Sequence, residues 1–423
     1  MTGYIVSEEK LQIVTEGKAK IFAYTLPSRN GEGISEQENL DKWELKDVPT
    51  RGMPVFYNPA MVQNRNISVM AVHAWKDKPK GEMNVADAMC GGGIRGIRYL
   101  LEAGIDGLHV DFVDLNPAAT RTCKKNVDLN GIDSSSYEIY TQDANAFLFS
   151  KGVVEENRYA IVDVDPFGNP MHYITGGLKA LRHDHGMLHV NATDLAVLAG
   201  VQLKATLRKY QARPLRHVAY HAEVAARILL GAIFRKAMEI DCTIKPLLTI
   251  AKNHFVKVIL EKIHDIESAN KDLENRMGYM VHCRECEEHF TALPGDIHDA
   301  TCPACNSSHV ESGGPLWLGD IQDRDFCMDL RSTFGEFSYM RGQKGLGKII
   351  ENCAGEARFP PGSHDIHEIA RSLTVSSVSL ESIIEDLKNQ GYNAARAALN
   401  PIAIKTTASR KLVSDVIAAR ATI

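Results

Sequence analysis

The chain has 423 residues, of which 44% are hydrophobic and 24% are charged, and its formal net charge is −5. This length and composition are typical of an ordinary globular protein with two or three structural units. They exclude a small disulfide scaffold, and no apolar run approaches the ~18 residues of a membrane helix. The acidic N-terminus lacks the pattern of a signal peptide, so we expect a cytoplasmic protein that does not bind membranes.

The central part of the chain alternates between strand-like and helix-like stretches, which predicts an α/β fold. A polar segment of about 80 residues precedes it. The predicted helices cover residues 94–102, 117–130, 194–210 and 215–240. The predicted strands cover residues 83–89, 109–113, 138–142, 159–165, 187–191, 244–251 and 254–262, and the last two join through a tight turn at Asn253. Five α/β repeats and a terminal hairpin outline the Rossmann-like sheet of a class I methyltransferase.

A smaller domain is expected after the hairpin, beyond a charged stretch. The predicted boundary lies near residue 270, so that residues 1–270 and 271–423 form two domains. In the second, helical patterns at 364–373 and 377–390 precede a strand-like tail, an order that is compatible with a winged-helix-like element. We expect this C-terminal domain to belong to the α+β class.

A glycine-rich segment, Asp87-Ala-Met-Cys-Gly-Gly-Gly-Ile-Arg95, lies between the first predicted strand and its helix. Glycines there let a ligand approach the backbone, and the helix N-terminus offers it free N–H groups. Asp114 ends the second strand, where an acid in Rossmann-like sites accepts hydrogen bonds from ribose hydroxyls. A helix cap is the alternative role for Asp114. Gly91, Gly93 and Gly96 also satisfy the G-x-G-x-x-G spacing, so the glycines alone leave a nicotinamide cofactor open.

The third predicted strand is followed by Asp143 and Ala144. Asp143 is placed to meet the amino group of an adenine. An ordinary turn residue is the alternative.

The fourth predicted strand leads into Asp163-Val-Asp-Pro-Phe-Gly168, a variant of the [Asn/Asp]-Pro-Pro-aromatic tetrapeptide of amino-methyltransferases. Asp165 and the Pro166 carbonyl can accept hydrogen bonds from an exocyclic amine, which favours the pyramidal nitrogen that attacks a methyl group. Asp165 can also receive the released proton, and Phe167 offers a face on which an extruded base stacks. A tight Asp-Pro turn is the alternative. Two acids and an aromatic at a central strand end favour Asp165 and Phe167 as catalytic residues, with Asp163 in support.

Four of the nine cysteines form two Cys-x-x-Cys pairs, Cys283 with Cys286 and Cys302 with Cys305, at the spacing of a zinc site. Each pair can occupy one edge of a tetrahedron of thiolates, which leaves no position open for catalysis. We therefore predict a structural zinc ion. The nearby histidines that could replace one cysteine are His282, His289, His298 and His309.

Residues 201–217 carry five basic residues and no acidic one: Lys204, Arg208, Lys209, Arg213 and Arg216. Nucleic-acid binding needs such a local concentration of positive charge when the net charge is negative. A solvated helix face is the alternative.

Together these motifs resemble those of the tRNA guanine-26 N2-dimethyltransferases, over most of the chain. The matching segments are Thr15–Ile21, Val55–Pro59, Asn64–Arg65, Gly93–Arg98, Asp163–Gly168, Ala192–Asp194, Leu207–Tyr210, Gly314–Gly319 and Ile404–Thr406. The resemblance implies transfer of one or two methyl groups from S-adenosyl-L-methionine to N2 of a guanine in tRNA, at position 26. We expect residues 271–423, the zinc-containing C-terminal domain, to bind tRNA, and no obligate protein partner is evident from the sequence.

The resemblance also implies roles for individual residues. Cofactor contacts are expected from Arg65, Arg95, Asp114, Asp143 and Ala144, with the last three at the ribose and adenine. Asp165 is expected to be catalytic, and Phe56 and Phe167 to line the base pocket.

Two other functions stay open. One is methylation of an exocyclic amine of adenine or cytosine in DNA, and the other is zinc-stabilised RNA binding with a vestigial cofactor pocket. The intact Asp114 and Asp165 favour an active enzyme. A cytosine C5 enzyme is disfavoured because no cysteine accompanies the Asp-Pro-Phe-Gly turn.

Overall fold

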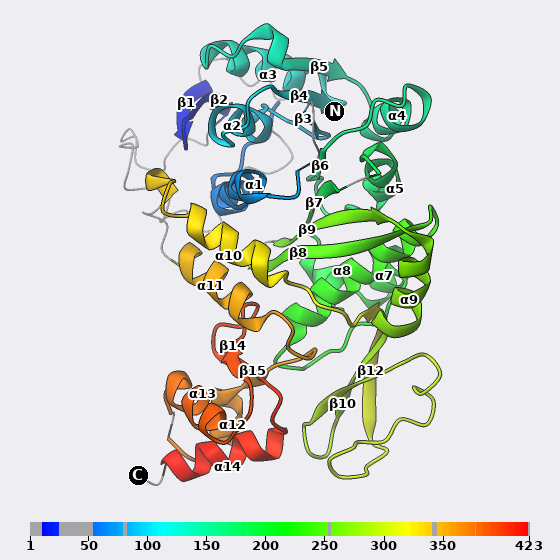
Figure 1. The fold of residues 1–423 in the computed structure, drawn as a ribbon, viewed down its shortest axis with the longest axis vertical. Coiled ribbons are helices and arrows are strands. Elements are labelled where there is room, and N and C mark those ends of the chain that lie inside the picture. Colours follow the sequence, from blue (N-terminus) through cyan, green and yellow to red (C-terminus); the bar gives the residue numbers. More distant parts are fainter. Residues whose placement is uncertain are drawn as a thin grey trace, which may run out of the picture. The chain divides into compact units, whose positions relative to one another are not determined.

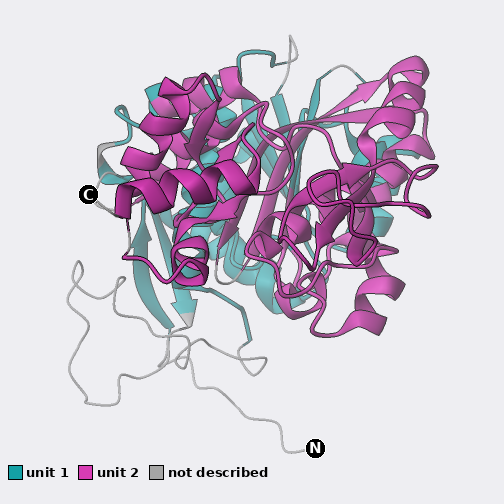
Figure 2. Cartoon of the chain, turned by 90° about the horizontal axis from the view of Figure 1, so that it is seen from below, with its two compact units in different colours: residues 1–165, 176–189, 332–344 teal, residues 166–175, 190–331, 345–423 magenta. Residues whose placement is uncertain are grey.

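The structure, a computed structural model, describes residues 11–24, 54–78, 83–183, 185–252, 255–340, 345–376 and 378–421. The chain divides into two compact units, coloured in Figure 2: residues 1–165, 176–189 and 332–344 make the first, and residues 166–175, 190–331 and 345–423 the second. The boundary predicted near residue 270 falls within a helix of the second unit. The division into residues 1–270 and 271–423 remains a proposal.

A seven-stranded sheet carries the predicted α/β core (Figure 1), in the order β5-β4-β3-β6-β7-β9-β8. Pairing is parallel between β5, β4, β3 and β6, and antiparallel between β8 and β9. The strands are β3 (Met83–Asp87), β4 (Leu108–Asp114), β5 (Tyr137–Thr141), β6 (Ile161–Val164), β7 (Gly186–Ala192), β8 (Cys242–Lys252) and β9 (Phe255–His264). This confirms the predicted class I methyltransferase sheet, although the turn at Asn253 lies outside the described residues. The strand order reverses between β3 and β6, and open parallel sheets bind ligands at the strand carboxyl ends beside such a point.

The helices that follow these strands are α2 (Ile94–Glu102), α3 (Pro117–Leu129), α4 (Ala144–Phe149) and α5 (Met171–Ala180). Both α2 and α3 pack against β4. A Cβ atom on Gly96 would lie 2.3 Å from the Phe112 ring, so only glycine lets α2 approach β4 this closely. The glycine therefore sets the position of the helix whose N-terminus faces the predicted cofactor loop.

The N-terminal segment contains more regular structure than its polar composition predicts. An antiparallel hairpin pairs β1 (Leu11–Glu16) with β2 (Ala19–Tyr24). The short η3 (Pro59–Met61) leads into α1 (Val62–Ala74), a helix that is buried along almost its whole length. Polar residues on this buried helix, including Asn64, Arg65 and Ser68, hide it from an analysis of hydrophobic periodicity.

The helices between β7 and β8 differ from the prediction. The prediction of a single helix at 194–210 is wrong, because this segment forms two helices, α6 (Leu195–Leu198) and α7 (Leu203–Tyr210). Gly200 between them adopts a left-handed conformation with φ of 78°, which no helix interior accommodates. The helix expected at 215–240 is shorter, α8 (His221–Met238), and packs against β8 and β12.

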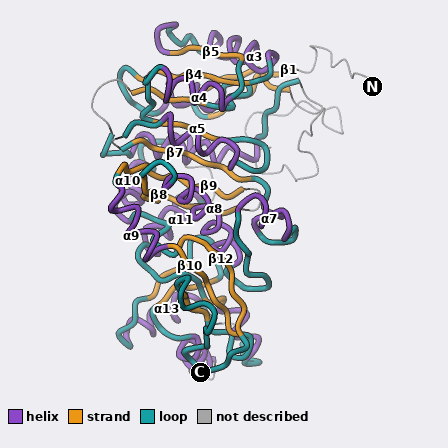
Figure 3. Tube along the Cα trace, turned by 90° about the vertical axis from the view of Figure 1, so that its right-hand side faces the viewer, coloured by secondary structure: helices purple, strands orange, loops and turns teal. Residues whose placement is uncertain are grey.

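Two small antiparallel sheets follow. The first, of which Figure 3 labels β10 and β12, has the order β11-β10-β12, with β10 (Met277–Cys283), β11 (His289–Ala292) and β12 (Val310–Trp317). The second has the order β13-β15-β14, with β13 (His364–Asp365), β14 (Ala394–Arg396) and β15 (Ala403–Thr406). The remaining helices are α9 (Ile266–Arg276), α10 (Arg324–Thr333), α11 (Leu346–Glu356), α12 (Ile366–Ser372), α13 (Leu380–Asn389) and α14 (Arg410–Ala421).

The last part of the chain is an α+β element around one apolar cluster, formed by side chains of α12, α13 and α14 with Ala394 and Ile404. The two helices predicted at 364–373 and 377–390 are confirmed as α12 and α13. The prediction of a strand-like tail holds only to Thr406, because α14 follows. Its Val and Ile residues favour strands by propensity, but they lie on the buried face of the helix.

Candidate active site and metal centre

The loop between β3 and α2 places main-chain groups where the strand order of the sheet reverses, between β3 and β6. Gly91 and Gly93 have φ values of 54° and 81°, and Gly93 is the N-cap of α2. A Cβ atom on Gly93 would lie 2.5 Å from the Cys123 sulfur, so this position admits only glycine. At Gly91 a Cβ would meet nothing closer than 3.6 Å, so glycine there serves the left-handed turn.

Asp114 ends β4 beside this loop. Its Oδ2 accepts a hydrogen bond from the Gly91 N–H at 2.9 Å, and its Oδ1 accepts one from the Asn116 N–H at 2.8 Å. The cap of α3 is Asn116, which accepts from the Ala118 N–H, so the helix-cap alternative for Asp114 is wrong. Each carboxylate oxygen has a second acceptor site, so Asp114 can still bind two hydroxyl groups.

Asp143 and Ala144 lie after β5, where α4 begins. Asp143 is the N-cap of α4, and its Oδ1 accepts a hydrogen bond from the Ala146 N–H at 3.0 Å. The cap fixes the orientation of an exposed carboxylate, whereas Ala144 is buried. The cap role is compatible with contact to a ligand, because a carboxylate has acceptor sites to spare.

Arg95 of α2 joins two carboxylates at the end of β6. Its Nη2 donates to Asp165 Oδ2, and its Nε lies 3.5 Å from Asp163 Oδ1. On the other edge of the guanidinium, Nη1 donates to Asn64 Oδ1 at 3.1 Å and to Ser68 Oγ at 2.7 Å. Burial alone would lower the pKa of Arg95, but the carboxylates of Asp163 and Asp165 raise it above its ordinary value. The side chain of Asp165 keeps 24% of its surface exposed, so the paired carboxylate remains accessible.

Asp163 and Asp87 form the buried layer beneath this pair. Tyr99 donates to Asp163 Oδ2 at 2.6 Å, and His189 Nδ1 lies 3.4 Å from the same oxygen. Asp87 accepts from the Gly96 N–H at 3.1 Å. Burial, and next the charge of Asp163, raise the pKa of Asp87 to about 7. These contacts fit Asp163 to the supporting role that the sequence suggests.

Arg65 of α1 is held by a second buried network. Its Nε and Nη2 donate to the two oxygens of Glu16 at 2.6 and 2.5 Å, and Nη2 also donates to the Asn58 carbonyl at 3.0 Å. Arg98 donates to Glu16 Oε1 at 2.8 Å and to both oxygens of Glu102. Burial would raise the pKa of Glu16, but Arg65 and Arg98 hold it at about 2. The network ties hairpin β1–β2 to α1 and α2, all within the first unit.

The two aromatic residues predicted at the base pocket are both exposed. Phe56 belongs to the first unit and is 37% exposed. Phe167 belongs to the second unit, which the chain enters at Pro166, and is 77% exposed. Each presents a ring that another group can cover.

The four predicted zinc ligands converge in the second unit. The Sγ atoms of Cys283 and Cys305 are 3.6 Å apart, and those of Cys286 and Cys302 are 3.5 Å apart. All four sulfurs lie within 4.8 Å of one another. Sulfurs of a tetrahedral zinc thiolate site are about 3.8 Å apart, from Zn–S bonds of about 2.3 Å, so the donor set fits zinc.

Matching turns shape the two cysteine pairs. The Glu287 N–H donates to the Cys283 carbonyl at 3.0 Å, and the Asn306 N–H donates to the Cys302 carbonyl at 2.8 Å. Both Glu287 and Asn306 are left-handed, with φ of 59° and 58°. Among the described residues, the four-cysteine group includes no histidine.

A second group of ligand-type side chains consists of Glu288, His289 and His364. The oxygens of Glu288 already accept from the His289 and Arg410 N–H groups. The two imidazole rings pack with centroids 4.7 Å apart. Burial lowers the pKa of His289 to about 4, so it packs as a neutral ring. All three residues belong to the second unit.

The basic segment lies on and after α7. Four of its basic residues are exposed: Lys204, Arg208, Arg213 and Arg216. Lys209 Nζ instead lies 3.1 Å from Asp194 Oδ2, so the exposed residues are better candidates than Lys209 for contact with RNA phosphates.

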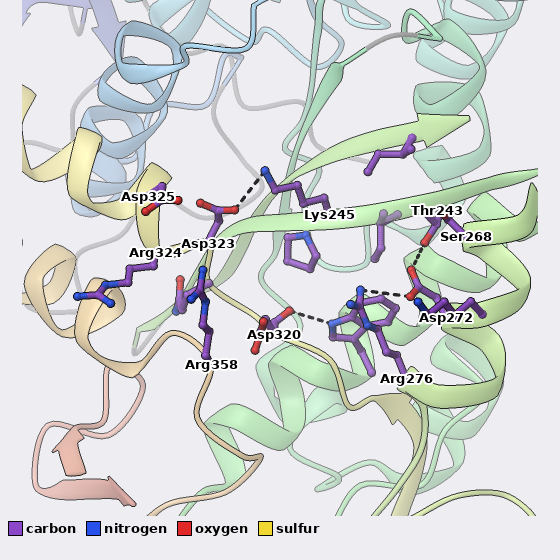
Figure 4. Close-up of a pocket in the computed structure, with 16 residues that line it drawn as sticks. Thr243, Lys245, Ser268, Asp272, Arg276, Asp320, Asp323, Arg324, Asp325 and Arg358 are labelled. Atoms are coloured by element: carbon purple, nitrogen blue, oxygen red, sulfur yellow. Dashed lines mark hydrogen bonds and ion pairs between the residues drawn. The ribbon is translucent and has the colours of Figure 1, made fainter. Parts of the chain in front are cut away.

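The second unit also contains a cavity of 410 Å³ beside β8 (Figure 4). Its charged lining is mixed and partly paired, as between Lys245 and Asp323 at 3.1 Å and between Arg276 and Asp272 at 3.2 Å. None of the predicted site residues lines it. The balanced charge favours no particular ligand.

Comparison with known proteins identifies the family. Residues 34–418 match the profile of the N2,N2-dimethylguanosine tRNA methyltransferases. The chain belongs to this family. The tRNA (guanine(26)-N(2))-dimethyltransferase of Methanothermobacter thermautotrophicus is 33% identical over 372 residues, which cover 86% of this chain and 93% of that protein. The protein of the same name from Methanosarcina acetivorans is 34% identical over 381 residues, covering 88% and 94%.

A solved structure supports the same assignment. Trm1 from Pyrococcus horikoshii, solved in complex with S-adenosyl-L-methionine, superposes on this family member with a TM-score of 0.77 and 29% identity. The match covers 96% of this chain and 99% of the other. Among the described residues, no helix is long and apolar enough to cross a membrane.

The structure adds functional candidates that the sequence did not reveal. Glu16 accepts hydrogen bonds from both Arg65 and Arg98, and Asn64 and Ser68 hold Arg95. The positions of these residues along the chain did not predict their contacts. They lie in the N-terminal hairpin, in α2 and in α1, whose buried polar residues hide its hydrophobic periodicity. In the sequence, the matching segments at Thr15–Ile21, Asn64–Arg65 and Gly93–Arg98 pointed to this region.

Proposed function

We propose that this chain transfers one or two methyl groups from S-adenosyl-L-methionine to the exocyclic N2 amine of guanine 26 in tRNA. The observation that carries the proposal is the ion pair between Arg95 and Asp165, which directly precedes Pro166 and Phe167. Family membership supports the substrate, and the cofactor in the Pyrococcus horikoshii structure supports the methyl donor. The alternatives of a DNA methyltransferase and of a vestigial RNA-binding protein have no comparable support.

The cofactor residues proposed are Arg65, Arg95, Asp114, Asp143 and Ala144. When bound, S-adenosyl-L-methionine supplies a methyl group on a positively charged sulfur. The carboxylate of Asp114, already oriented by the Gly91 and Asn116 N–H groups, accepts hydrogen bonds from the ribose hydroxyls. Asp143 and Ala144, at the N-terminus of α4, receive the adenine. The two buried guanidinium groups contact the cofactor's polar end.

Asp165 is the catalytic residue of the proposal, because it touches the reacting amine. The lone pair of guanine N2 is delocalised into the ring, so the amine is a weak nucleophile. Hydrogen bonds from its N–H groups to Asp165 and to the Pro166 carbonyl favour a pyramidal nitrogen, and they strengthen as positive charge develops on it. The Arg95 guanidinium fixes the carboxylate before the substrate arrives. Asp165 then accepts the proton that the nitrogen loses, directly or through water.

Phe167 and, separately, Phe56 are proposed as aromatic residues that contact the target base. A guanine inside a folded tRNA is stacked and must leave the stack to present its amine. An exposed aromatic ring replaces the lost stacking, which is worth about 1–3 kcal/mol per base. Phe167 follows Asp165 by two residues, so stacking and hydrogen bonding act on the same base.

Cys283, Cys286, Cys302 and Cys305 hold a structural zinc ion in this proposal. The support is the convergence of four thiols with no open ligand position. A zinc ion there would join the two cysteine turns and stabilise the second unit. A tRNA substrate supports the expected cytoplasmic location.

Transfer of a labelled methyl group tests the proposal. Purified protein should label a tRNA transcript that carries guanine 26 and leave duplex and single-stranded DNA unlabelled. Labelling of DNA but not of tRNA would overturn the substrate assignment. No labelling of either, from folded protein that binds tRNA but not the cofactor, would favour the vestigial alternative.

A further inference from the structure

The loop that carries Phe167 is fastened by a reciprocal pair of hydrogen bonds inside the second unit. The Gly168 N–H donates to Thr193 Oγ1 at 2.7 Å, and the Thr193 N–H donates to the Gly168 carbonyl at 3.0 Å. Gly168 is left-handed, with φ of 80°, so the chain turns directly after Phe167. The Thr193 hydroxyl therefore binds the N–H of Gly168, and the Thr193 backbone N–H binds the Gly168 carbonyl, so Thr193 satisfies both polar main-chain groups of the turn.

The next residue joins this turn to the basic helix. Asp194 Oδ1 accepts from the Tyr210 hydroxyl at 2.6 Å, and its Oδ2 lies 3.1 Å from Lys209 Nζ. Tyr210 is fully buried, and its carbonyl accepts from Arg235 Nη2 at 2.5 Å. Burial, and next the charge of Asp194, raise the pKa of the Tyr210 hydroxyl, so it remains a donor. Hydrogen bonds thus connect α8 with the end of α7 and with Asp194, and Asp194 is joined by its peptide bond to Thr193, which holds the Phe167 turn.

The backbone turn bears directly on the placement of Phe167. The residue is 77% exposed, so the conformation of the turn contributes to where the ring points. A displacement of about 1 Å at a reacting group can lower a rate roughly a hundredfold.

We propose that Thr193 is a positioning residue that holds the Phe167 turn in the orientation for base stacking, and that Asp194 couples this turn to α7. The inference rests on the proposed function, because it takes Phe167 as the residue on which the guanine stacks. It assigns roles to two residues outside the proposed cofactor and catalytic set.

The test compares Thr193→Val, which removes only the hydroxyl, with Thr193→Ser, which keeps it. Single-turnover methylation with saturating cofactor should be about tenfold slower in Thr193→Val, with the tRNA dissociation constant changed less than about threefold. Thr193→Ser should stay within about threefold of wild type. Thr175→Val, at comparable burial in α5, is the matched control and should match wild type.

A fluorescence measurement reads the stacking without the chemistry. In a tRNA with 2-aminopurine at position 26, binding to wild type should leave emission quenched by stacking. Thr193→Val and Phe167→Ala should both relieve that quenching, and Tyr210→Phe should relieve part of it, because it removes the donor to Asp194. Each variant is first checked for wild-type thermal unfolding and zinc content. If Thr193→Val misfolds, Tyr210→Phe carries the same comparison.

The possible outcomes separate the inference from the function on which it rests. Wild-type rate and quenching in both Thr193→Val and Tyr210→Phe, from a wild-type enzyme that methylates tRNA, would overturn the positioning role alone. A wild-type protein that neither methylates nor binds tRNA would overturn the proposed function. Equal loss in Thr193→Val and Thr193→Ser would mean that packing of the side chain, and not its hydroxyl, holds the turn, and would also overturn the inference.

Discussion

Replacement of Asp165 should impair the chemical step while leaving binding intact. In Asp165→Ala, Arg95 keeps its contacts with Asp163, Asn64 and Ser68, so its charge is not left buried and alone. We therefore expect unfolding to become easier by only about 2 kcal/mol, the scale of one charge-assisted hydrogen bond. Loss of one preorganised acceptor typically slows the chemical step about 10²- to 10³-fold.

Asp165→Asn separates the two roles of the carboxylate. The amide keeps an acceptor oxygen and loses the charge, the ion pair with Arg95 and the ability to take a proton. If hydrogen bonding to the amine dominates, Asn should retain activity well above Ala. If proton acceptance dominates, the two variants should be equally slow.

The assay is single-turnover methylation with saturating tRNA and cofactor, together with separate binding measurements for each. Binding should stay within a few-fold of wild type in both variants. A wild-type rate in Asp165→Ala would refute the catalytic assignment. A loss that appears only in tRNA affinity would refute the argument that Asp165 acts in the transition state.

Four further predictions follow from other parts of the structure. Asp114→Ala removes hydrogen bonds worth about 1.5–3 kcal/mol each, so calorimetry should find S-adenosyl-L-methionine bound at least tenfold more weakly; unchanged affinity contradicts the ribose assignment. Metal analysis should find about one zinc ion per chain. Cys283→Ser should lose this zinc, and its second unit should become less stable. Absence of zinc from wild-type protein purified without chelators would contradict the prediction. Reversing Lys204 and Arg208 to Glu should weaken tRNA binding and lower the slope of its salt dependence by about 1–2, whereas an unchanged slope means a merely solvated helix. The pKa of Glu16 is lowered from 4.5 to about 2, so its ion pairs should add about 3 kcal/mol to the free energy of unfolding above pH 5. This contribution should be lost as the pH falls toward 2. Glu16→Gln should be less stable than wild type at pH 7 and should lack this part of the pH dependence.

The sheet was predictable because its strands are short, apolar and separated by glycine and proline signals. Each predicted strand of the core lies within a few residues of an observed one, and the antiparallel β8–β9 hairpin is confirmed. The break between α6 and α7 was not predicted, because the residues around Gly200 keep a helical apolar pattern across the turn. The buried helix α1 was missed for the opposite reason, since its interior carries Asn, Arg and Ser.

The candidate site could be predicted in its individual residues but not in its connections. Strand ends gave Asp114 and Asp165, and cysteine spacing gave the four thiols that the structure brings together. The pairing of Arg95 with Asp165 joins residues 70 positions apart, and that of Arg65 with Glu16 joins residues 49 apart. No local pattern encodes which cation meets which carboxylate when several of each are buried together. Only the packed structure determines these pairs.

The most direct test of the central claim is nucleoside mass spectrometry on two tRNA transcripts that differ only in the N2 amino group at position 26. One carries guanosine at position 26, and the other carries inosine there, which is guanosine without the N2 amine. After incubation with enzyme and S-adenosyl-L-methionine, the guanosine transcript should yield N2-methylguanosine, N2,N2-dimethylguanosine or both, and the inosine transcript should yield neither. Equal methylation of the two transcripts, or methylation of another base or ring position, would contradict the account.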